Sequence, residues 1–165
     1  MTQLTDVMIE DPRWDALDLD VISERAALAA LKICGLAPDG FEISVMGCDD
    51  QRIADLNAEF RGKPTPTNVL SWPAFELAAH EAGSPPTHPN ADFPPESIGD
   101  IAIAFETCQR EAAEKSININ DHVTHLVLHG CLHLLGYDHE NDADATLMEG
   151  LEIKALATLG IPNPY

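Results

Sequence analysis

The sequence predicts an α+β fold in which a single mixed β-sheet of about four strands packs against about five helices. Two observations support this fold class. Along the chain, short segments whose apolar residues alternate with period two are interspersed with longer segments of helical period. The chain also has 165 residues, 45% of them hydrophobic, which is enough for the core of one globular domain but short for two. We therefore expect residues 1–165 to form a single domain.

The first part of the chain is expected to contribute two strands and two helices. The strands are residues 5–11 (TDVMIED) and 41–47 (FEISVMG), and the helices are residues 20–35 and 50–62. The first helix is rich in alanine and leucine and is amphipathic, and Gly35 ends it. Asp49 is a suitable N-cap for the second helix, which ends at Gly62.

The second part repeats this alternation of strands and helices. We expect strands at 68–72 and 98–105, and helices at 107–116, from Asn120 or Asp121 to about Gly136, and at 142–160. Asn120 or Asp121 can cap the histidine-bearing helix, and Gly160 with Pro162 closes the last one. Because helices and strands are interspersed, the strands should form one sheet that the helices cover.

One segment departs from this pattern. Residues 73–97 contain six prolines and little apolar periodicity, so we interpret them as a mobile surface insertion. Two histidines, His80 and His88, lie in it without a partner at metal-ligand spacing, and we do not expect them to bind a metal.

Composition and charge limit the possible functions. The formal net charge is −19, which disfavours nucleic acid as a partner unless a local site such as the one around Arg61 and Lys63 binds it. No run of about 18 apolar residues is present, and the first residues are acidic, unlike those of a signal peptide. The four cysteines form no C-x-x-C pair. These features predict a soluble, cytoplasmic protein that does not bind a membrane.

Four histidines lie on one face of a predicted buried helix. They recur every three or four residues, at positions 122, 125, 129 and 133, while leucine and valine occupy much of the remaining surface. A lone histidine in such a helix is usually hydrogen-bonded within the core. Four in one stripe instead indicate a metal site.

The chain after the helix selects the ligands among these histidines. Pairs at i and i+4 that can hold one ion occur at 125/129 and at 129/133. Gly136 can end the helix and turn the chain back, which brings His139 close to the last turns. His125 is about 12 Å further along the axis than His133. The favoured ligands of one Zn²⁺ ion are therefore His129, His133 and His139, with a fourth position open for water; His122 and His125 would have hydrogen-bonding or core roles.

The spacing H-x-x-x-H-x-x-G-x-x-H also occurs in metzincin proteases. Those enzymes carry a glutamate general base directly after the first histidine, where this chain has Gly130. A metal can still polarise an oxygen and lower the pKa of water to about 7 without that base, but peptide hydrolysis lacks its proton shuttle. An RNA phosphodiester, with its neighbouring 2′-hydroxyl, suits such a site better. The glycine would also leave room for substrate, or would only allow close helix packing.

Several segments together carry a resemblance to a known family. HGCLHLLGYDH resembles the signature of the YbeY family of bacterial rRNA maturation endoribonucleases. The segments LNAEFRGKPTPTNVLSWP, IGDIAIA and MEGLEIKALATLGIPNPY are similar to further family segments, so the resemblance spans roughly residues 42–165. It implies a zinc-dependent endoribonuclease that cuts single-stranded RNA in maturation of the 16S rRNA 3′ end and in ribosome quality control. The implied partners are the small ribosomal subunit and its precursor rRNA; basic ribosomal proteins are further candidates for so acidic a protein.

The resemblance also assigns roles to residues. It implies that His129, His133 and His139 are the zinc ligands and that Arg61 is the functional arginine. An arginine fork can hold two phosphate oxygens and stabilise developing charge; without the resemblance, Arg61 would equally suit a surface helix end. The chain departs from the family pattern at Pro64, at Asn68, where the family usually has aspartate, and at Trp72, where it has phenylalanine.

Two other function classes remain open on the sequence. A zinc amidohydrolase or protease would need a carboxylate base from elsewhere, and the candidates are Asp100, Asp138 and Glu149. A non-catalytic ribosome assembly factor would use the zinc ion only to hold its fold.

Overall fold

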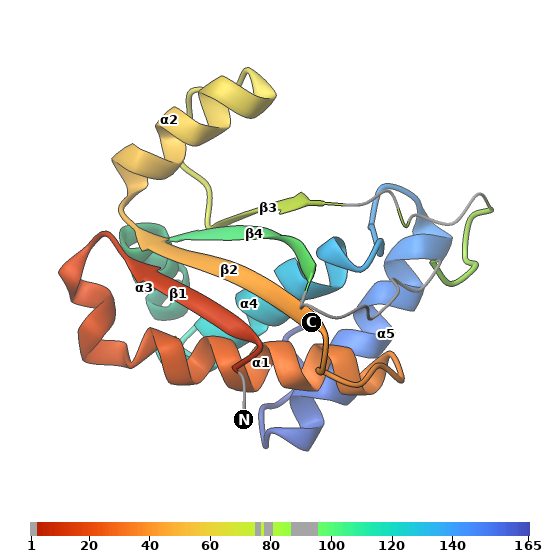
Figure 1. Ribbon diagram of the computed structural model, residues 1–165. Helices are drawn as coiled ribbons and strands as arrows, with labels where there is room; N and C mark the ends of the chain where they lie inside the picture. Colours follow the sequence, from red (N-terminus) through yellow and green to blue (C-terminus); the bar gives the residue numbers. More distant parts are fainter. Residues whose placement is uncertain (1–2, 75–76, 78–80, 87–95) are drawn as a thin grey trace.

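The computed structural model describes residues 3–74, 77, 81–86 and 96–165, and it has the expected α+β fold (Figure 1). Its four strands form one mixed sheet in the order β1-β2-β4-β3. Strands β1, β2 and β4 run parallel to one another, and β3 pairs antiparallel with β4 at the edge. The strands are β1 (Thr5–Ile9), β2 (Phe41–Cys48), β3 (Val69–Pro73) and β4 (Glu96–Ala104).

Five α-helices and one short 3-10 helix occur in the described part of the chain. The α-helices are α1 (Leu19–Ile33), α2 (Asp50–Arg61), α3 (Phe105–Glu114), α4 (Ile119–Leu134) and α5 (Asp142–Thr158). The 3-10 helix η1 (Pro12–Leu17) is not among the predicted elements. Its sequence signal is an aspartate followed by proline. Asp11 is the N-cap and accepts a hydrogen bond from the Arg13 N–H, and the proline occupies the first helical position.

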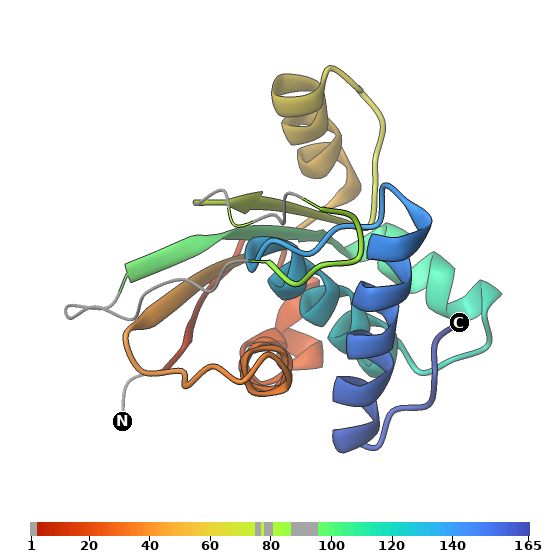
Figure 2. The same ribbon diagram turned by 90° about the vertical axis from the view of Figure 1, so that its right-hand side faces the viewer.

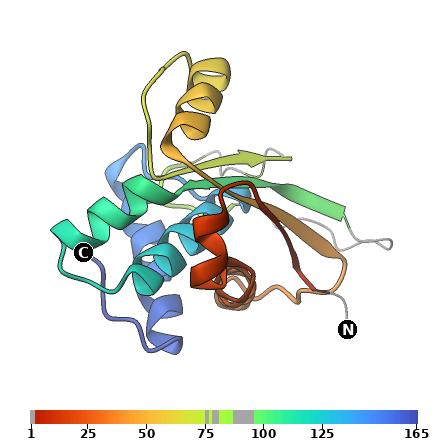
Figure 3. The ribbon, with the colours of Figure 1, turned by 90° about the vertical axis from the view of Figure 1, so that its left-hand side faces the viewer.

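The helices lie on both faces of the sheet, but unequally. Helices α1, α4 and α5 cover one face, where most of the buried apolar side chains form one large core (Figure 2). On the other face α2 stands at one end of the sheet, over a second and smaller cluster (Figure 3). That cluster consists of Cys48, Ile53, Leu56, Leu70, Ala102 and Ala104.

Two helix ends position the residues of interest. Gly62, at φ 69°, ends α2 directly after Arg61, so the arginine side chain projects from the last turn. Gly136, at φ 100°, turns the chain back after α4. The N-cap of α4 lies two or three residues before the predicted one: it is Asn118, whose side chain accepts a hydrogen bond of 2.7 Å from the Asn120 N–H.

The proline-rich segment is shorter than expected, since β4 begins at Glu96 and includes the last two residues assigned to it. His80 and His88 lie outside the described residues. Of the described part, Leu77 is buried, and the Gly83 N–H donates a 2.7 Å hydrogen bond to Asp144 in α5. No helix within the described ranges is both long and apolar enough to cross a membrane.

Candidate functional site

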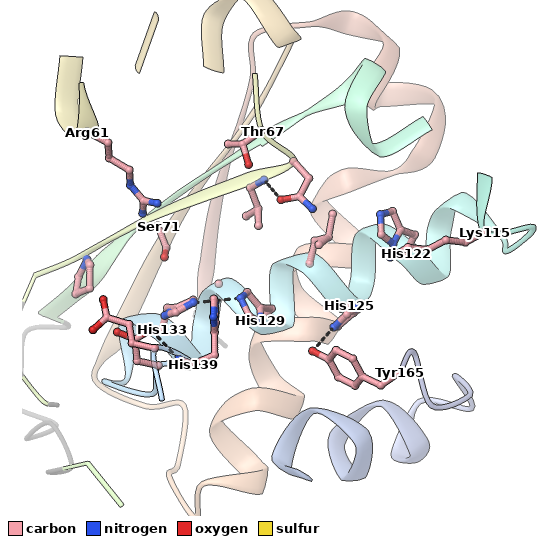
Figure 4. Close-up of a pocket in the computed structure, with 17 residues that line it drawn as sticks. Arg61, Thr67, Ser71, Lys115, His122, His125, His129, His133, His139 and Tyr165 are labelled. Carbon is pink, nitrogen blue, oxygen red and sulfur yellow. Dashed lines mark hydrogen bonds between the residues drawn. The ribbon is translucent and has the colours of Figure 1, made fainter. Parts of the chain in front are cut away.

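The structure brings the three predicted metal ligands together. One turn of α4 separates His129 from His133, and the turn at Gly136 returns the chain so that His139 faces both (Figure 4). The ring centroids lie 4.6 Å (129–133), 5.3 Å (129–139) and 5.2 Å (133–139) apart. One nitrogen from each ring lies within 4.8 Å of the other two, so these residues could hold one metal ion.

The nitrogen geometry fits a metal ion. Nε2 of His129 and Nε2 of His133 are 3.1 Å apart, close to the roughly 3.3 Å expected for two nitrogens bound tetrahedrally to zinc at about 2.0–2.1 Å. Burial, together with the neighbouring His129, lowers the pKa of His133 to about 4. His133 is therefore neutral at pH 7 and has a lone pair for a metal.

A buried carboxylate lies behind the first ligand. Glu152 of α5 has no exposed surface, and its Oε1 contacts Nδ1 of His129. Its Oε2 accepts a hydrogen bond from the Tyr165 hydroxyl. Since an ionised carboxylate can only accept, Nδ1 of His129 carries the proton and its Nε2 keeps the lone pair that faces His133.

His125 belongs to this buried network and not to the group of three. Its Nε2 lies 3.4 Å from the Tyr165 hydroxyl and 3.6 Å from Oε1 of Glu152. Burial raises the pKa of Glu152, but its contacts with His125, His129 and Tyr165 outweigh this and bring the pKa to about 2. Ligand atoms of His125, His129 and Glu152 also lie within 4.8 Å of one another, forming a second group that shares His129.

The three histidines form part of a pocket of about 650 Å³ between β3 and α4. Arg61 is exposed at its rim, and Figure 4 shows its side chain reaching from the end of α2 toward the histidines. Thr67 and Ser71 line the β3 side, and Lys115 lies at the opposite end from Arg61. Arg61 and Lys115 are two of only nine basic residues in the chain. Two carboxylates, Asp138 and Glu140, also line the pocket, so its charged groups balance one another, whereas the whole chain has a net charge of −19.

The end of the pocket near Lys115 explains one departure from the family pattern. Glu111 of α3 accepts hydrogen bonds from the Asn68 amide at 3.1 Å and contacts Nε2 of His122 at 2.9 Å. An aspartate at position 68 would place two carboxylates side by side, so the amide of Asn68 suits this site better. Burial lowers the pKa of His122, although its bond to Glu111 acts in the opposite direction. His122 thus has the predicted core role.

Of the three carboxylates proposed as possible bases, one faces the pocket. Asp138 lines it beside His139 and accepts a 2.7 Å hydrogen bond from the His139 N–H. Glu149 lines a smaller cavity that also includes His129 and His139. Asp100 lies on the face of the sheet that α2 partly covers, so it does not reach the histidines.

Gly130 lies where α4 packs against the sheet. A Cβ atom added to it would lie 3.1 Å from Cδ1 of Ile101 in β4, tighter than an ordinary van der Waals contact. Gly130 also lines the pocket. Close packing of α4 on β4 is therefore one reason for a glycine at this position.

Sequence comparisons identify relatives of this chain, and a structure comparison identifies a protein with the same fold. The family described as endoribonuclease YbeY matches residues 11–160. The chain is 58% identical to the endoribonuclease YbeY of Ruegeria pomeroyi, with 97% of this chain and 96% of the relative covered. It is 55% identical to that of Cereibacter sphaeroides over the full length of both. The solution structure of TM1509 from Thermotoga maritima has the same fold, with a TM-score of 0.60 and 24% identity over 92% of this chain and 86% of that one.

Proposed function

The chain belongs to the endoribonuclease YbeY family, and from this premise we propose that it is a zinc-dependent enzyme that cuts single-stranded RNA. We further propose that it acts in maturation of the 16S rRNA 3′ end and in ribosome quality control. The observation that carries the proposal is the convergence of three imidazoles in a pocket whose rim bears Arg61.

His129, His133 and His139 would hold the zinc ion. Three neutral imidazoles are a ligand set typical of catalytic zinc, because they leave a coordination position for water or substrate. When bound, the ion supplies Lewis acidity to a phosphoryl oxygen and lowers the pKa of water. The chain contributes the fixed orientation of the three rings, two of which lie on a single turn of α4.

Arg61 would bind the phosphate that is cut. Its guanidinium is permanently charged and can donate two parallel hydrogen bonds to phosphate oxygens, which stabilises the charge that builds up during cleavage. The side chain is exposed and has no ion-pair partner among the described residues, so it is available to a substrate. A pocket of about 650 Å³ has room for more than a phosphate group. A nucleotide can enter it more easily from an unpaired strand, because no base pair has to be broken.

The geometry gives limited support to the two rival functions. An amidohydrolase or protease would need Asp138 as its base, since it is the candidate carboxylate that shares the main pocket with the histidines. An assembly factor with structural zinc would need no open coordination position, yet the histidines line a large pocket. The open pocket favours the nuclease over the assembly factor, whereas Asp138 meets the requirement of the amidohydrolase, so the two enzymes are distinguished by their substrates.

The proposed partners follow from the proposed substrate. Precursor rRNA of the small ribosomal subunit would occupy the pocket, and a protein of net charge −19 would contact basic ribosomal proteins more readily than RNA over its remaining surface. We place this activity in the cytoplasm, where ribosomes are assembled.

One experiment tests the function directly. The purified protein is analysed for metal content and is then incubated with single-stranded RNA, double-stranded RNA and a peptide substrate. We expect about one zinc ion per chain and cleavage of single-stranded RNA only. Peptide cleavage would favour the amidohydrolase, and a zinc-loaded protein that cuts neither substrate would favour the assembly factor.

A further inference from the structure

Glu152 is the most deeply buried charged group near the candidate metal centre. It lies on α5, at 0% exposure, and each carboxylate oxygen has its own partner. Oε1 contacts Nδ1 of His129, and Oε2 accepts from the hydroxyl of Tyr165. The network thus joins α4, α5 and the segment that follows α5.

The two ring nitrogens of His129 have different partners. Nδ1 points to Glu152, whereas Nε2 lies 3.1 Å from Nε2 of His133 on the side of the pocket. A histidine that donates one ring N–H to a carboxylate is fixed in one tautomer and one orientation, and its other nitrogen becomes a better metal ligand. Glu152 lies where a carboxylate would fix a metal-binding histidine in this way.

We propose that Glu152 is a positioning residue for the metal centre: it holds the proton of His129 on Nδ1, so that Nε2 is presented to the ion, and Tyr165 holds Glu152 in place. This inference rests on the proposed function only in taking His129 as a metal ligand. It requires neither RNA cleavage nor a particular substrate.

Packing alone does not account for a glutamate at this position. Helix α5 already buries Met148, Ala155 and Leu156 against the core. Burying a carboxylate is costly unless its hydrogen bonds compensate for lost water, and replacing a buried ionic group by a well-packed apolar one is often neutral or stabilising. A leucine of similar size would therefore dock α5 equally well. What leucine cannot supply is an acceptor for Nδ1 of His129.

Tyr165 completes the environment of the carboxylate. Its hydroxyl donates to Oε2 of Glu152, and its ring packs edge-on against His125 with centroids 5.6 Å apart. Tyr165→Phe keeps this ring contact and removes the hydroxyl. The variant should therefore weaken the support of Glu152 without disturbing the packing around His125.

The test measures zinc affinity and the tautomer of His129 separately from activity. Metal-free wild type, Glu152→Gln and Glu152→Leu are titrated with zinc in competition with a chromogenic chelator. Loss of a residue that orients a metal-bound histidine typically costs 10- to 100-fold in metal affinity. We expect Glu152→Leu to fall in that range, Glu152→Gln to lose less because its amide oxygen can still accept from Nδ1, and Tyr165→Phe to show a smaller loss in the same direction.

Glu149→Gln is the matched control. Glu149 lies one helical turn before Glu152 and lines the same small cavity, but within the described residues it makes no hydrogen bond to His129. The zinc affinity of the Glu149→Gln protein should equal that of the wild type. Circular dichroism and thermal melting of all variants check that the fold is kept.

Nitrogen NMR of the metal-free protein provides the second measurement. The ¹⁵N shifts of His129, assigned with a His129→Gln variant, should show the proton on Nδ1; in Glu152→Leu the preference should be lost. A proton on Nε2 in the wild type, or a wild-type zinc affinity in a folded Glu152→Leu protein, would overturn the proposal. If the wild type does not cut RNA but both measurements come out as expected, the proposed function fails and the role of Glu152 stands.

Discussion

Nε2 of His133 faces Nε2 of His129 at 3.1 Å, one turn further along α4. With the His129 proton held on Nδ1, the His129 nitrogen in this pair has a free lone pair, and His133 is neutral at physiological pH. Two such nitrogens side by side at the wall of an open pocket are a site for a cation. The first prediction follows from this pair.

Replacing any one of His129, His133 and His139 by alanine should remove most of the bound zinc, because two imidazoles hold the ion far more weakly than three. Metal analysis after gel filtration measures the loss. His80→Ala and His88→Ala are the controls and should keep the wild-type stoichiometry. Zinc loss in these control variants, or its retention in the three ligand variants, would contradict the assignment.

Arg61→Glu should reduce cleavage of single-stranded RNA by at least about 100-fold, since it removes a donor to the phosphate and adds repulsion. Zinc content and melting temperature should stay close to those of the wild type because the side chain is exposed. Arg52→Glu, on the same helix but outside the pocket, is the matched control. It breaks a surface ion pair with Glu10 at 3.3 Å, which should cost no more than about 1 kcal/mol of stability, and should leave cleavage unchanged.

Gly130→Glu should lower the melting temperature as well as RNA cleavage, because its side chain would meet Ile101 where α4 packs on β4 and would bury a charge there. Gly130→Ala tests packing alone. A single methyl group needs Ile101 to move by a few tenths of an ångström, and we expect this variant to fold and to bind zinc. Thermal melting and cleavage are measured on the same samples. If Gly130→Glu melts and cuts like the wild type, neither the packing nor the substrate explanation holds.

The stability of the protein should depend on pH through His122. Burial lowers the pKa of its imidazole in the fold, against the opposing effect of Glu111, while the charges of Lys115 and His125 lower it further. As the pH falls below about 6.5, the value for an unfolded chain, the unfolded state binds more protons than the folded state, so the free energy of unfolding decreases.

His122→Gln isolates this effect, since glutamine can still donate to Glu111 but does not titrate. Denaturant unfolding at pH 7 and pH 5 should show a smaller loss of stability in the variant than in the wild type. Other titrating groups, including the metal ligands, are common to both proteins and cancel in the difference. Equal losses in the two proteins would refute the assignment to His122.

The sequence was sufficient to predict the three converging histidines because their relation is local. Helical spacing sets the distance from His129 to His133, and a glycine turn brings back His139 only six residues later. The same reasoning predicted the caps of α2, where Asp49 and Gly62 act within one turn of the helix ends. The strands and helices follow from local periodicity in the same way.

Glu152 could not be identified in this way. It is 23 residues from His129 in the sequence, and its role depends on how α5 rotates against α4. Nothing local distinguishes it from Glu149, one turn earlier on the same helix. The two cations of the pocket could not be paired from the sequence either. Arg61 and Lys115 are 54 residues apart, and only the fold brings both of them to the same pocket.

Helix α2 is anchored by the small cluster on the less covered face of the sheet, whereas α4 lies within the main core. Regions with few buried apolar contacts open at lower free energy than the core, so the backbone amides of α2 should exchange with deuterium well before those of α4. Arg61 therefore sits on an element that can fluctuate while the metal ligands stay fixed. The arginine can adjust to strands of different conformation without any loss of order at the histidines, and exchange measured by mass spectrometry would show the two helices as separate units of stability.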